Sequence, residues 1–577
     1  MNRLTAVIRW SPANEVLAVE PGRFSRAHLD LAVERTHVFT FDESNYFYNS
    51  ETGVLVSIIG YAANIDDVRL RHGIQTECDV EVVECLYSGT ATQDSLSFLD
   101  ELDGVYFVLV YDEKREKVYL AQSEFGCPLP IYYTDTPGGL VVSTSMKLLL
   151  QRTNMNREFH NPSIQDFMSY GEIISNENTI VAGVRKLVTQ RNMVVDVRSR
   201  RKRFVRYQPT KQMMRKDEAE AQLIDSIGAN IARLARRLRG QDYALTLTGG
   251  WDSNLMLSFL YKENPKTINA VTINGGGATN EIPAVERVLK SYPNRVRPFT
   301  RTMQSSIFNS LPNVVWILEG YMRQSGSLLR YALAELMKDT GIGSVFLGSG
   351  ADPILNTDMG PGGDQVCEPY VERLSPALLK EIKRTIRNVC VRSFIGDLYF
   401  GVKGETDENW IRRKSLRGGY RERYNNEIDY NMKMHELMLN AFGIQGLYPF
   451  VNRGTVRCAK PLRPQNRQKS FYKHKVRDYL GPDISIVLKK SGAVVDTESL
   501  FHANKQWLQM MLGSEFIERT LSAGQIRKIR ANPARYYDSL WKVLYLCLFE
   551  RLILSGKYDG RFDDAQIGDT LESVLSR

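Results

Sequence analysis

The pattern of apolar residues changes near residue 207, and this change constrains the fold more than any other feature of the sequence. In the first part, runs of β-branched and aromatic residues follow one another with turns between them, as in the strand predicted at 105–111 (VYFVLVY) and its returning partner at 117–121. A further strand is predicted at 140–143 and a helix at 81–88. This order predicts stacked antiparallel sheets with helices outside them.

After residue 207, short strands alternate with helices. The sequence predicts a helix at 217–239, a strand at 244–247, a helix at 254–261, and strands at 270–273 and 344–347. Such alternation predicts a parallel, doubly wound sheet, which binds ligands outside the carboxyl ends of its strands. We therefore expect two domains, an antiparallel sandwich at 1–207 and a doubly wound α/β domain at 208–577 whose last part is mainly helical.

Composition is that of an ordinary soluble protein and excludes few functions. The 577 residues are 43% apolar and 24% charged, and the seven cysteines include no CxxC pair, which favours a reducing cytoplasm over a zinc ribbon or a disulfide framework. There is no apolar run of about eighteen residues and no secretory signal, so we expect no membrane span. The net charge of +9 suits an anionic ligand. Because the basic run 198–206 carries no RNA-binding motif, we interpret it as a solvated strand or linker and do not expect nucleic-acid binding.

The most informative segment is LTGGWDS at 247–253, between a predicted strand and a predicted helix. Two glycines permit a tight turn whose backbone N–H groups face one concavity, and the start of the helix favours an anion. Asp252 supplies a carboxylate for Mg²⁺ beside the phosphates. The segment lacks the GK[ST] of a Walker A loop, and an ordinary strand–helix turn is the alternative. The residues expected to bind a nucleotide here are Leu247, Thr248, Gly249, Gly250, Asp252 and Ser253.

A second turn of the same kind follows the strand at 344–347. It reads GSGAD, from Gly348 to Asp352. If the two strands are neighbours in a parallel sheet, Asp252 and Asp352 face each other across its carboxyl edge and can bind Mg²⁺ together with a triphosphate. The alternative is that Asp352 caps the turn that follows it.

These segments resemble the asparagine synthetase superfamily. TGGWDS is similar to its SGGxDS pyrophosphate loop and GSGAD to its GxGxD loop. Further landmarks follow the family's order between about residues 20 and 555: LDGVYF at 102–107, YD at 111–112, EFGCPLPIYY at 124–133, STSMK at 143–147, PF at 449–450, KHKVR at 473–477 and KK at 489–490.

The resemblance implies an Ntn-hydrolase-like glutaminase domain followed by an ATP-pyrophosphatase synthetase domain of the PP-loop, adenine-nucleotide α-hydrolase-like type. It implies ATP and Mg²⁺ as cofactors, adenylation of a substrate carboxylate, release of pyrophosphate and attack by an amine. It also implies that Thr272 and Ile273 meet adenine, that Lys473 contacts the phosphates and that Lys490 stabilises the transition state of amide formation.

The N-terminal domain departs from the family where glutamine would be hydrolysed. The family's nucleophile is a cysteine exposed when Met1 is removed, and here residue 2 is Asn. Residues 59–61 (IGY) replace its Asn-Gly-Glu and residues 122–123 (QS) its Arg-Asp pair, while Cys78 and Cys85 are interpreted as partly buried helix residues that fit a core position better than a nucleophile. We predict that this domain keeps its fold but does not hydrolyse glutamine.

The synthetase domain departs where aspartate would bind. Residues 443–452 (GIQGLYPFVN) lack the Glu, Arg and Asp of the family's GIExRxPFLD. These losses point to branches whose amine belongs to the substrate, the β-lactam synthetases and the lasso-peptide macrolactam cyclases. β-Lactam synthetases carry a tyrosine paired with a glutamate where this chain has Ser349.

Amide formation still needs a base, because an ammonium group cannot attack. Asp429, Lys433 and Glu436 share one face of the helix predicted before residue 442. Glu436 is our first choice for the base and Glu427 the second, and a solvated helix face is the alternative for each.

The sequence therefore predicts an ATP- and Mg²⁺-dependent ligase that adenylates a carboxylate and closes an intramolecular amide, with release of AMP and pyrophosphate. A β-lactam ring on a small amino acid derivative is placed ahead of macrolactam closure on a peptide. Intermolecular ligation as in asparagine synthetase, a non-catalytic binding protein and an RNA-modifying enzyme are the alternatives. Residues 353–426 could form a lid over the substrate, and a homodimer is left open.

Overall fold

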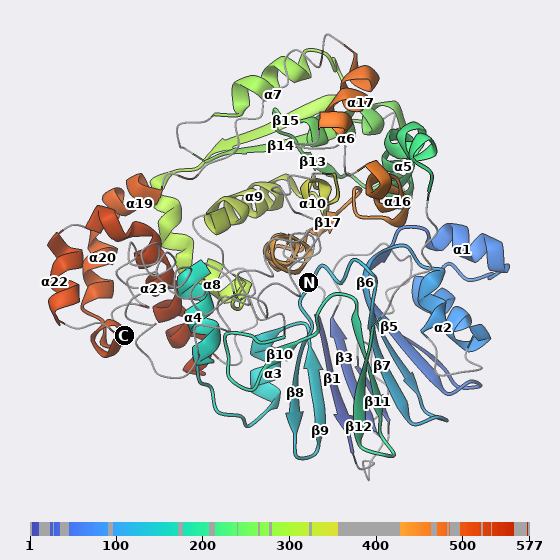
Figure 1. The fold of residues 1–577 in the computed structure, drawn as a ribbon, viewed down its shortest axis with the longest axis horizontal. Coiled ribbons are helices and arrows are strands. Elements are labelled where there is room, and N and C mark those ends of the chain that lie inside the picture. The colour runs from blue at the N-terminus through green and yellow to red at the C-terminus, as the bar shows by residue number, and fades with distance from the viewer. Residues whose placement is uncertain are drawn as a thin grey trace, which may run out of the picture.

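The computed structural model describes residues 3–10, 23–26, 28–34, 46–90, 96–170, 173, 177–206, 214–238, 240–263, 266–275, 280–321, 326–355, 427–462, 470–481, 484, 495, 497–520, 523–531, 533–558 and 574. A β-sandwich forms the lower part of the molecule in Figure 1, a parallel sheet with helices on its faces forms the upper part, and C-terminal helices lie beside both.

The N-terminal domain is a sandwich of two six-stranded antiparallel sheets. The first sheet has the order β10 (Arg185–Lys186), β8 (Tyr132–Thr136), β9 (Gly139–Ser143), β1 (Arg3–Arg9), β3 (Leu29–Glu34) and β2 (Arg23–Arg26). The second has the order β12 (Arg201–Arg206), β11 (Arg191–Asp196), β7 (Lys117–Gln122), β6 (Gly104–Asp112), β5 (Val54–Ala62) and β4 (Tyr46–Asn49).

Strand β6 shows why this part of the sequence forms a sandwich. Every residue in it is buried, because successive side chains point to opposite faces and both faces are covered. Val105, Phe107 and Leu109 belong to the core between the sheets. Tyr106 and Val108 belong to a second core under the helices α1 (Ile65–His72) and α2 (Asp79–Thr90) and the short helix η1 (Ser97–Asp100).

The C-terminal domain is built on a five-stranded parallel sheet. Its order is β15 (Val296–Thr302), β14 (Ile268–Asn274), β13 (Ala244–Thr246), β16 (Ser344–Phe346) and β17 (Gln445–Leu447). The chain starts in the middle at β13, moves outward through β14 to β15, and then returns to β16 on the other side of β13. The direction of winding therefore reverses between β13 and β16, which makes that position the topological switch point of the sheet.

Helices join the parallel strands and cover the sheet. Before and between the strands lie α5 (Lys216–Arg237), α6 (Trp251–Glu263), α7 (Ile282–Leu289), η2 (Ser305–Ser310), α8 (Leu311–Leu318), α9 (Gly326–Thr340), α10 (Ala351–Leu355), η4 (Glu427–Met432) and α15 (Lys433–Ala441). After β17 come α16 (Arg453–Leu462) and α17 (Ser470–Leu480). In Figure 1, α7 and α17 lie above the sheet and α9 below it.

The C-terminal helices pack against both domains. They are α19 (Thr497–Ala503), α20 (Lys505–Leu512), α21 (Glu515–Thr520), α22 (Ala523–Ala531), η7 (Pro533–Tyr536), α23 (Tyr537–Phe549) and η8 (Glu550–Leu554). Helix α23 contacts α8 of the C-terminal domain and α4 (Asn161–Tyr170) of the sandwich domain, and α4 follows α3 (Met146–Arg152). Lys542 donates to the Met168 carbonyl at 3.1 Å, and the rings of Phe167 and Tyr545 lie 5.4 Å apart.

Buried polar contacts also join the two domains. Arg237 of α5 lies 2.6 Å from Asp79 at the start of α2, with both side chains under a tenth exposed. Glu319, which ends α8, accepts hydrogen bonds from the Ser145 hydroxyl at 2.7 Å and the Met146 N–H at 2.6 Å. Lys147 lies 3.3 Å from the same carboxylate. These contacts tie the sandwich to the helices that flank the parallel sheet.

The predicted fold class is confirmed for both domains. The elements differ in their bounds: the helix predicted at 254–261 begins at Trp251, so Asp252 lies in its first turn and not in the preceding loop. The basic run 198–206 ends in the edge strand β12, most of which is half-buried or exposed. The predicted domain boundary after residue 207 lies outside the described residues. Among the helices that are described, none has the length and apolar character needed to cross a membrane.

Candidate functional site

The two predicted glycine turns lie side by side. Strands β13 and β16 pair in parallel, and the Thr246 hydroxyl donates to the Phe346 carbonyl at 3.2 Å. The turn after β13 leads into α6 and the turn after β16 into α10. Both therefore leave the carboxyl edge of the sheet at its switch point, where doubly wound sheets bind their ligands.

The first turn is held in shape by its own side chains. The Thr248 hydroxyl accepts from the Gly250 N–H at 3.1 Å, and the Ser253 hydroxyl accepts from the Thr248 N–H at 3.1 Å. Asn254, which is fully buried, donates to the carbonyls of Thr248 at 3.0 Å and Gly250 at 2.6 Å. Thr248 and Ser253 were expected to bind phosphate, but in the structure their hydroxyls form hydrogen bonds within the turn. The groups that can bind an anion are therefore the backbone N–H groups at the N-terminus of the 13-residue helix α6.

The second turn approaches the first because its glycines lack side chains. A Cβ atom at Gly348 would lie 3.7 Å from the Asp252 Cβ, so this glycine sits directly against the first aspartate. Gly350 has φ +88°, and a Cβ there would lie 2.3 Å from the Val451 Cγ2. Residues larger than glycine would push the turn away from its neighbours. Asp352 follows in the first turn of α10 with its side chain exposed.

Tyr472 lies near the two aspartates, although no sequence pattern singles it out. It lies fully buried on α17, directly before Lys473. Burial raises the pKa of Tyr472 well above its ordinary value, and the negative charges of Asp252 and Asp352 raise it further. Both carboxylates therefore act on one buried hydroxyl group. The only sequence signal was its place beside the KHKVR segment.

These residues fit a magnesium nucleotide. Two carboxylates from adjacent strands, two glycine turns and a helix N-terminus meet at one sheet edge, and oxygen ligands are those that Mg²⁺ prefers. No cluster of three or more His, Cys, Asp or Glu side chains is found within the described parts of the chain. Two protein carboxylates leave coordination positions for the oxygens of a triphosphate, so Asp252 and Asp352 would hold the ion together with the nucleotide.

The other predicted nucleotide residues lie around this edge. Thr272, near the end of β14, is buried and donates from its hydroxyl to the Leu247 carbonyl at 2.8 Å. The Leu247 side chain is fully buried in the core, so Leu247 would contact a ligand only through its backbone. Ile273 is 8% exposed on the same strand as Thr272, and Lys473 is half-buried on α17.

Glu436, the first choice for the base, is buried at the carboxyl end of β17. Its Oε2 accepts from the Gly446 N–H at 3.1 Å and from the Tyr448 hydroxyl at 2.8 Å. Burial raises its pKa to about 7, although both hydrogen bonds favour the charged form. The alternative of a solvated helix face is therefore wrong for Glu436. The pairing of Glu436 with Tyr448 was not evident from the sequence.

Three predictions fall beyond what the structure describes. Lys490 lies outside the described residues. Glu427 begins η4, but the position of its side chain is not described. The segment expected to form a lid, 353–426, is described only as far as residue 355.

The described cysteines do not resemble a glutaminase nucleophile. Cys78 is 5% exposed at the start of α2, and Cys127 is 1% exposed. Burial raises the pKa of Cys127 to about 12, which disfavours its thiolate. Cys85 is exposed on α2, and partial burial together with Glu84 and Glu81 raises its pKa. Burial likewise raises the pKa of Cys458.

A separate cavity of about 430 Å³ lies near the C-terminal helices. Phe159, Phe516 and Tyr558 line it together with Arg157 and Arg551. None of its lining residues belongs to the two glycine turns or to α17, so it is not part of the candidate site.

Comparison with known proteins matches both domains. A family model described as a glutamine amidotransferase domain matches residues 22–207, and one described as asparagine synthase matches residues 233–382. The chain is 25% identical to the glutamine-hydrolyzing asparagine synthetase 2 of Bacillus subtilis (strain 168) over 134 residues, which are 22% of this chain and 17% of that protein. It is 23% identical to the amidase chry2 of Gibberella zeae over 398 residues, 65% of this chain and 56% of that protein. The matches thus span about half the length of one relative and about a sixth of the other.

Proposed function

We propose that this chain, which belongs to the asparagine synthase family and joins a glutamine amidotransferase domain to an asparagine synthase domain, is an ATP-dependent ligase that forms an amide within its own substrate. The match of the second domain to asparagine synthase supports an asparagine synthetase-like ATP-dependent amide ligase. Closure of a ring within the substrate is our additional proposal.

One observation carries the proposal. Asp252 and Asp352 follow neighbouring strands at the switch point of the parallel sheet, a Cβ atom at Gly348 would lie 3.7 Å from the Asp252 Cβ, and the charges of both carboxylates act on the buried Tyr472 hydroxyl. Mg²⁺ bound there with ATP would neutralise charge on the departing pyrophosphate. The backbone N–H groups at the start of α6 would bind phosphate oxygens, and Lys473 would add a positive charge nearby.

The reaction has two steps. A carboxylate oxygen of the substrate attacks the α-phosphorus of ATP, and the bond to pyrophosphate breaks. An amine of the same substrate then attacks the acyl carbon, the bond to the AMP oxygen breaks, and the amine gives up a proton. AMP is a far better leaving group than a carboxylate oxygen, which is why the first step must precede the second.

We assign to Glu436 the role of the base that accepts the proton of the attacking amine. A carboxyl group whose pKa is about 7 can accept a proton near neutral pH, where an ordinary glutamate is too weak a base. Its hydrogen bond from the Tyr448 hydroxyl favours the charged form of Glu436, which is the form that accepts a proton. Lys490 is proposed, from the resemblance alone, as the group that stabilises the negative charge of the second step.

The substrate is proposed to be a small amino acid derivative that closes to a β-lactam, or a peptide that closes to a macrolactam. The absence of an aspartate-binding pattern at 443–452 and the high pKa of Cys127 support an internal amine over ammonia from glutamine. Incubation with ATP, Mg²⁺ and each class of substrate should give AMP, pyrophosphate and a product lighter by one water in mass spectrometry. ADP and orthophosphate as products would contradict the proposal.

Ligation with an external amine is the second candidate, because the matched relatives include a glutamine-hydrolyzing asparagine synthetase. It predicts that pyrophosphate release depends on an added amine or ammonium salt. The internal reaction needs neither.

Replacement of Asp252 tests the nucleotide site directly. Asp252→Asn removes one negative charge from the metal site and should lower pyrophosphate release about a hundredfold or more, since such charge stabilisation is commonly worth that much. Circular dichroism and the melting temperature should stay close to the wild type, because Asp252 lies at the sheet edge and not in the core. Full turnover in this variant would remove Asp252 from the metal site.

A further inference from the structure

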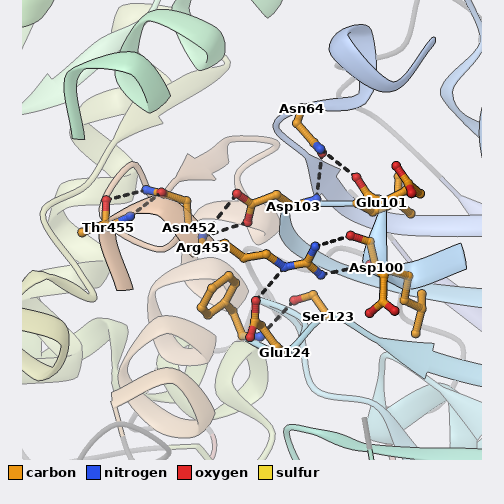
Figure 2. Close-up of polar contacts among 12 residues, drawn as sticks. Asn64, Asp100, Glu101, Asp103, Ser123, Glu124, Asn452, Arg453 and Thr455 are labelled. Atoms are coloured by element: carbon orange, nitrogen blue, oxygen red, sulfur yellow. Dashed lines mark hydrogen bonds and ion pairs between the residues drawn. The ribbon is translucent and has the colours of Figure 1, made fainter. Parts of the chain in front are cut away.

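Arg453 joins the two domains at the turn that follows β17. Its Nε lies 2.7 Å from Glu124 Oε1, and both side chains are about 15% exposed. Its other guanidinium nitrogens donate to the carbonyls of Leu99 and Asp100, and its backbone N–H donates to both carboxylate oxygens of Asp103 at 3.0 and 3.2 Å (Figure 2). Every one of these partners belongs to the sandwich domain, in the segments just before β6 and just after β7.

The sandwich side of this contact is itself fixed. The Asn64 side chain accepts from the Asp103 N–H at 2.7 Å and donates to the Glu101 carbonyl at 2.8 Å (Figure 2). Burial raises the pKa of Asp103 and of Glu124, while the charge of Arg453 lowers both. The positive charge of the Arg453 guanidinium therefore offsets part of the free-energy cost of burying the carboxyl groups of Asp103 and Glu124 away from water.

The turn between β17 and α16, residues 448–452, is held at both ends by the sandwich domain. At its start the Tyr448 N–H donates to the Tyr61 hydroxyl of β5 at 2.8 Å. At its end, Arg453 contacts Asp103 and Glu124 of the sandwich domain. In the middle, Asn230 of α5 donates to the Pro449 carbonyl at 2.8 Å, and Asn452 caps α16 by accepting from the Thr455 N–H at 2.8 Å.

This turn supports the second glycine turn of the candidate site. Val451 packs so closely on Gly350 that a Cβ atom there would lie 2.3 Å from the Val451 Cγ2. Gly350 precedes Asp352 by two residues. The Leu347 N–H, just before the turn, donates to the Leu447 carbonyl of β17 at 2.9 Å. A shift of residues 448–452 would therefore move the segment that carries Asp352.

We infer that the sandwich domain positions the second nucleotide turn: its contacts with Arg453 and Tyr448 fix residues 448–452, which hold Gly350 and thereby place Asp352 opposite Asp252. Arg453 is a positioning residue that acts through Val451 and Gly350 and does not touch the nucleotide. This role gives the sandwich domain a part in the reaction that needs no glutamine. The inference rests on the proposed function for the identity of the ligand, ATP with Mg²⁺.

The test compares two buried interdomain arginines in the full chain. Arg453→Met removes the guanidinium that supports residues 448–452. Arg237→Met removes a guanidinium from a different contact between the same domains, where Arg237 lies 2.6 Å from Asp79 and no residue of the glycine turns takes part. Both variants should melt at lower temperature than the wild type. Isothermal titration with ATP and Mg²⁺ should show binding about tenfold weaker in Arg453→Met and unchanged within about twofold in Arg237→Met.

Two milder variants keep the test decisive if Arg453→Met does not fold. Glu124→Gln keeps the size of the side chain and should weaken ATP·Mg²⁺ binding a few-fold, about threefold. Arg453→Lys keeps the charge and should bind between the wild type and Arg453→Met. In pyrophosphate assays the KM for ATP·Mg²⁺ should rise in these variants while the KM for the substrate carboxylate stays constant.

Two results would overturn the inference: wild-type affinity in the Arg453 and Glu124 variants, or an equal loss in Arg237→Met. A wild-type chain that binds ATP·Mg²⁺ but forms no pyrophosphate with any carboxylate would contradict the proposed function alone and leave the comparison of affinities valid. A wild-type chain that does not bind ATP·Mg²⁺ would overturn both.

Discussion

At the scale of single residues, the candidate site depends on how two carboxylates are held near each other before a metal ion binds. The negative charges of Asp252 and Asp352 both act on the buried Tyr472 hydroxyl. Such outer partners orient metal ligands, and their loss commonly weakens metal affinity about ten- to a hundredfold. Tyr472 is thus as much a part of the site as the aspartates.

Tyr472→Phe should raise the Mg²⁺ concentration needed for half-maximal pyrophosphate release about tenfold, because the two carboxylates lose the buried polar group on which both of their charges act. Titration of activity with Mg²⁺ at saturating ATP measures the effect. Tyr479→Phe on the same helix is the matched control, since that hydroxyl meets Lys262 at 2.8 Å near the surface and should leave the Mg²⁺ requirement unchanged. Equal Mg²⁺ curves for Tyr472→Phe and wild type would exclude this role.

Glu436→Gln separates a catalytic from a structural role. The folded chain keeps the Glu436 proton up to a pKa of about 7, while the unfolded chain releases it near 4.5. Between these values the folded state binds more protons, so this group makes the free energy of unfolding fall as pH rises from 4.5 to 7. Above pH 7, the buried charge of Glu436 lowers the free energy of unfolding by about 3 kcal/mol. Glu436→Gln should remove this pH dependence in denaturant unfolding.

The same variant should also slow amide formation by at least about a hundredfold if Glu436 accepts the proton. Exchange of pyrophosphate into ATP, which reports adenylation alone, should continue. Glu335→Gln is the control, because burial also raises the pKa of that carboxyl on α9 but it belongs to no proposed step. A normal rate of product formation in Glu436→Gln would assign the residue a structural role.

At the scale of elements, the short strands and their turns determine the site. Strands β13, β16 and β17 have three residues each, yet their carboxyl ends place the TGGWDS turn, the GSGAD turn and residues 448–452 in a row. In a parallel sheet, the side chains that follow neighbouring strands meet at one edge, so small shifts of one turn affect the next.

Gly350→Ala should disturb this row of turns. The alanine would adopt an unfavourable positive φ of +88°, and its Cβ would clash with Val451. Gly341→Ala is the matched control, because that glycine has φ +71° with nothing within 4 Å and carries the backbone strain alone. Binding of ATP·Mg²⁺, measured calorimetrically, should weaken in Gly350→Ala and not in Gly341→Ala.

A second substitution can show that the clash causes the loss. Val451→Ala removes the Cγ2 atom and should restore part of the affinity lost by Gly350→Ala, with a coupling of about 1 kcal/mol or more between the two positions. Additive effects in this double-mutant cycle would mean that the two turns do not interact.

The elements show which features a sequence can reveal. The two glycine–aspartate turns were predictable because each motif is local and follows an apolar strand. Strand β15 (VRPFTRT) was missed because it is a charged edge strand with a proline, and β17 because it is short and has no β-branched residue. The contact of Arg453 with Glu124 joins residues 329 positions apart, and no local pattern encodes such a pair.

At the scale of the whole molecule, the role that we propose for the sandwich domain differs from the glutamine hydrolysis that its family resemblance implies. Its described cysteines are buried or have a raised pKa. The Arg237, Glu319 and Arg453 contacts together make this domain a support for the nucleotide domain.

Glutamine should therefore not act as the nitrogen source. With glutamine labelled at its amide nitrogen, ATP and Mg²⁺, the product should contain no label, and glutamate should not accumulate above a control without enzyme. The cyclising reaction should proceed equally well with and without glutamine. Labelled product would show that the sandwich domain still hydrolyses glutamine.

The packing of α23 on α4 has a consequence for how the chain is made. Helix α4 ends at Tyr170, whereas α23 begins only at Tyr537. The surface that α4 presents to Tyr545 and Lys542 therefore stays uncovered until the ribosome has synthesised α23. A chain released before that point would expose this apolar surface, to which chaperones can bind.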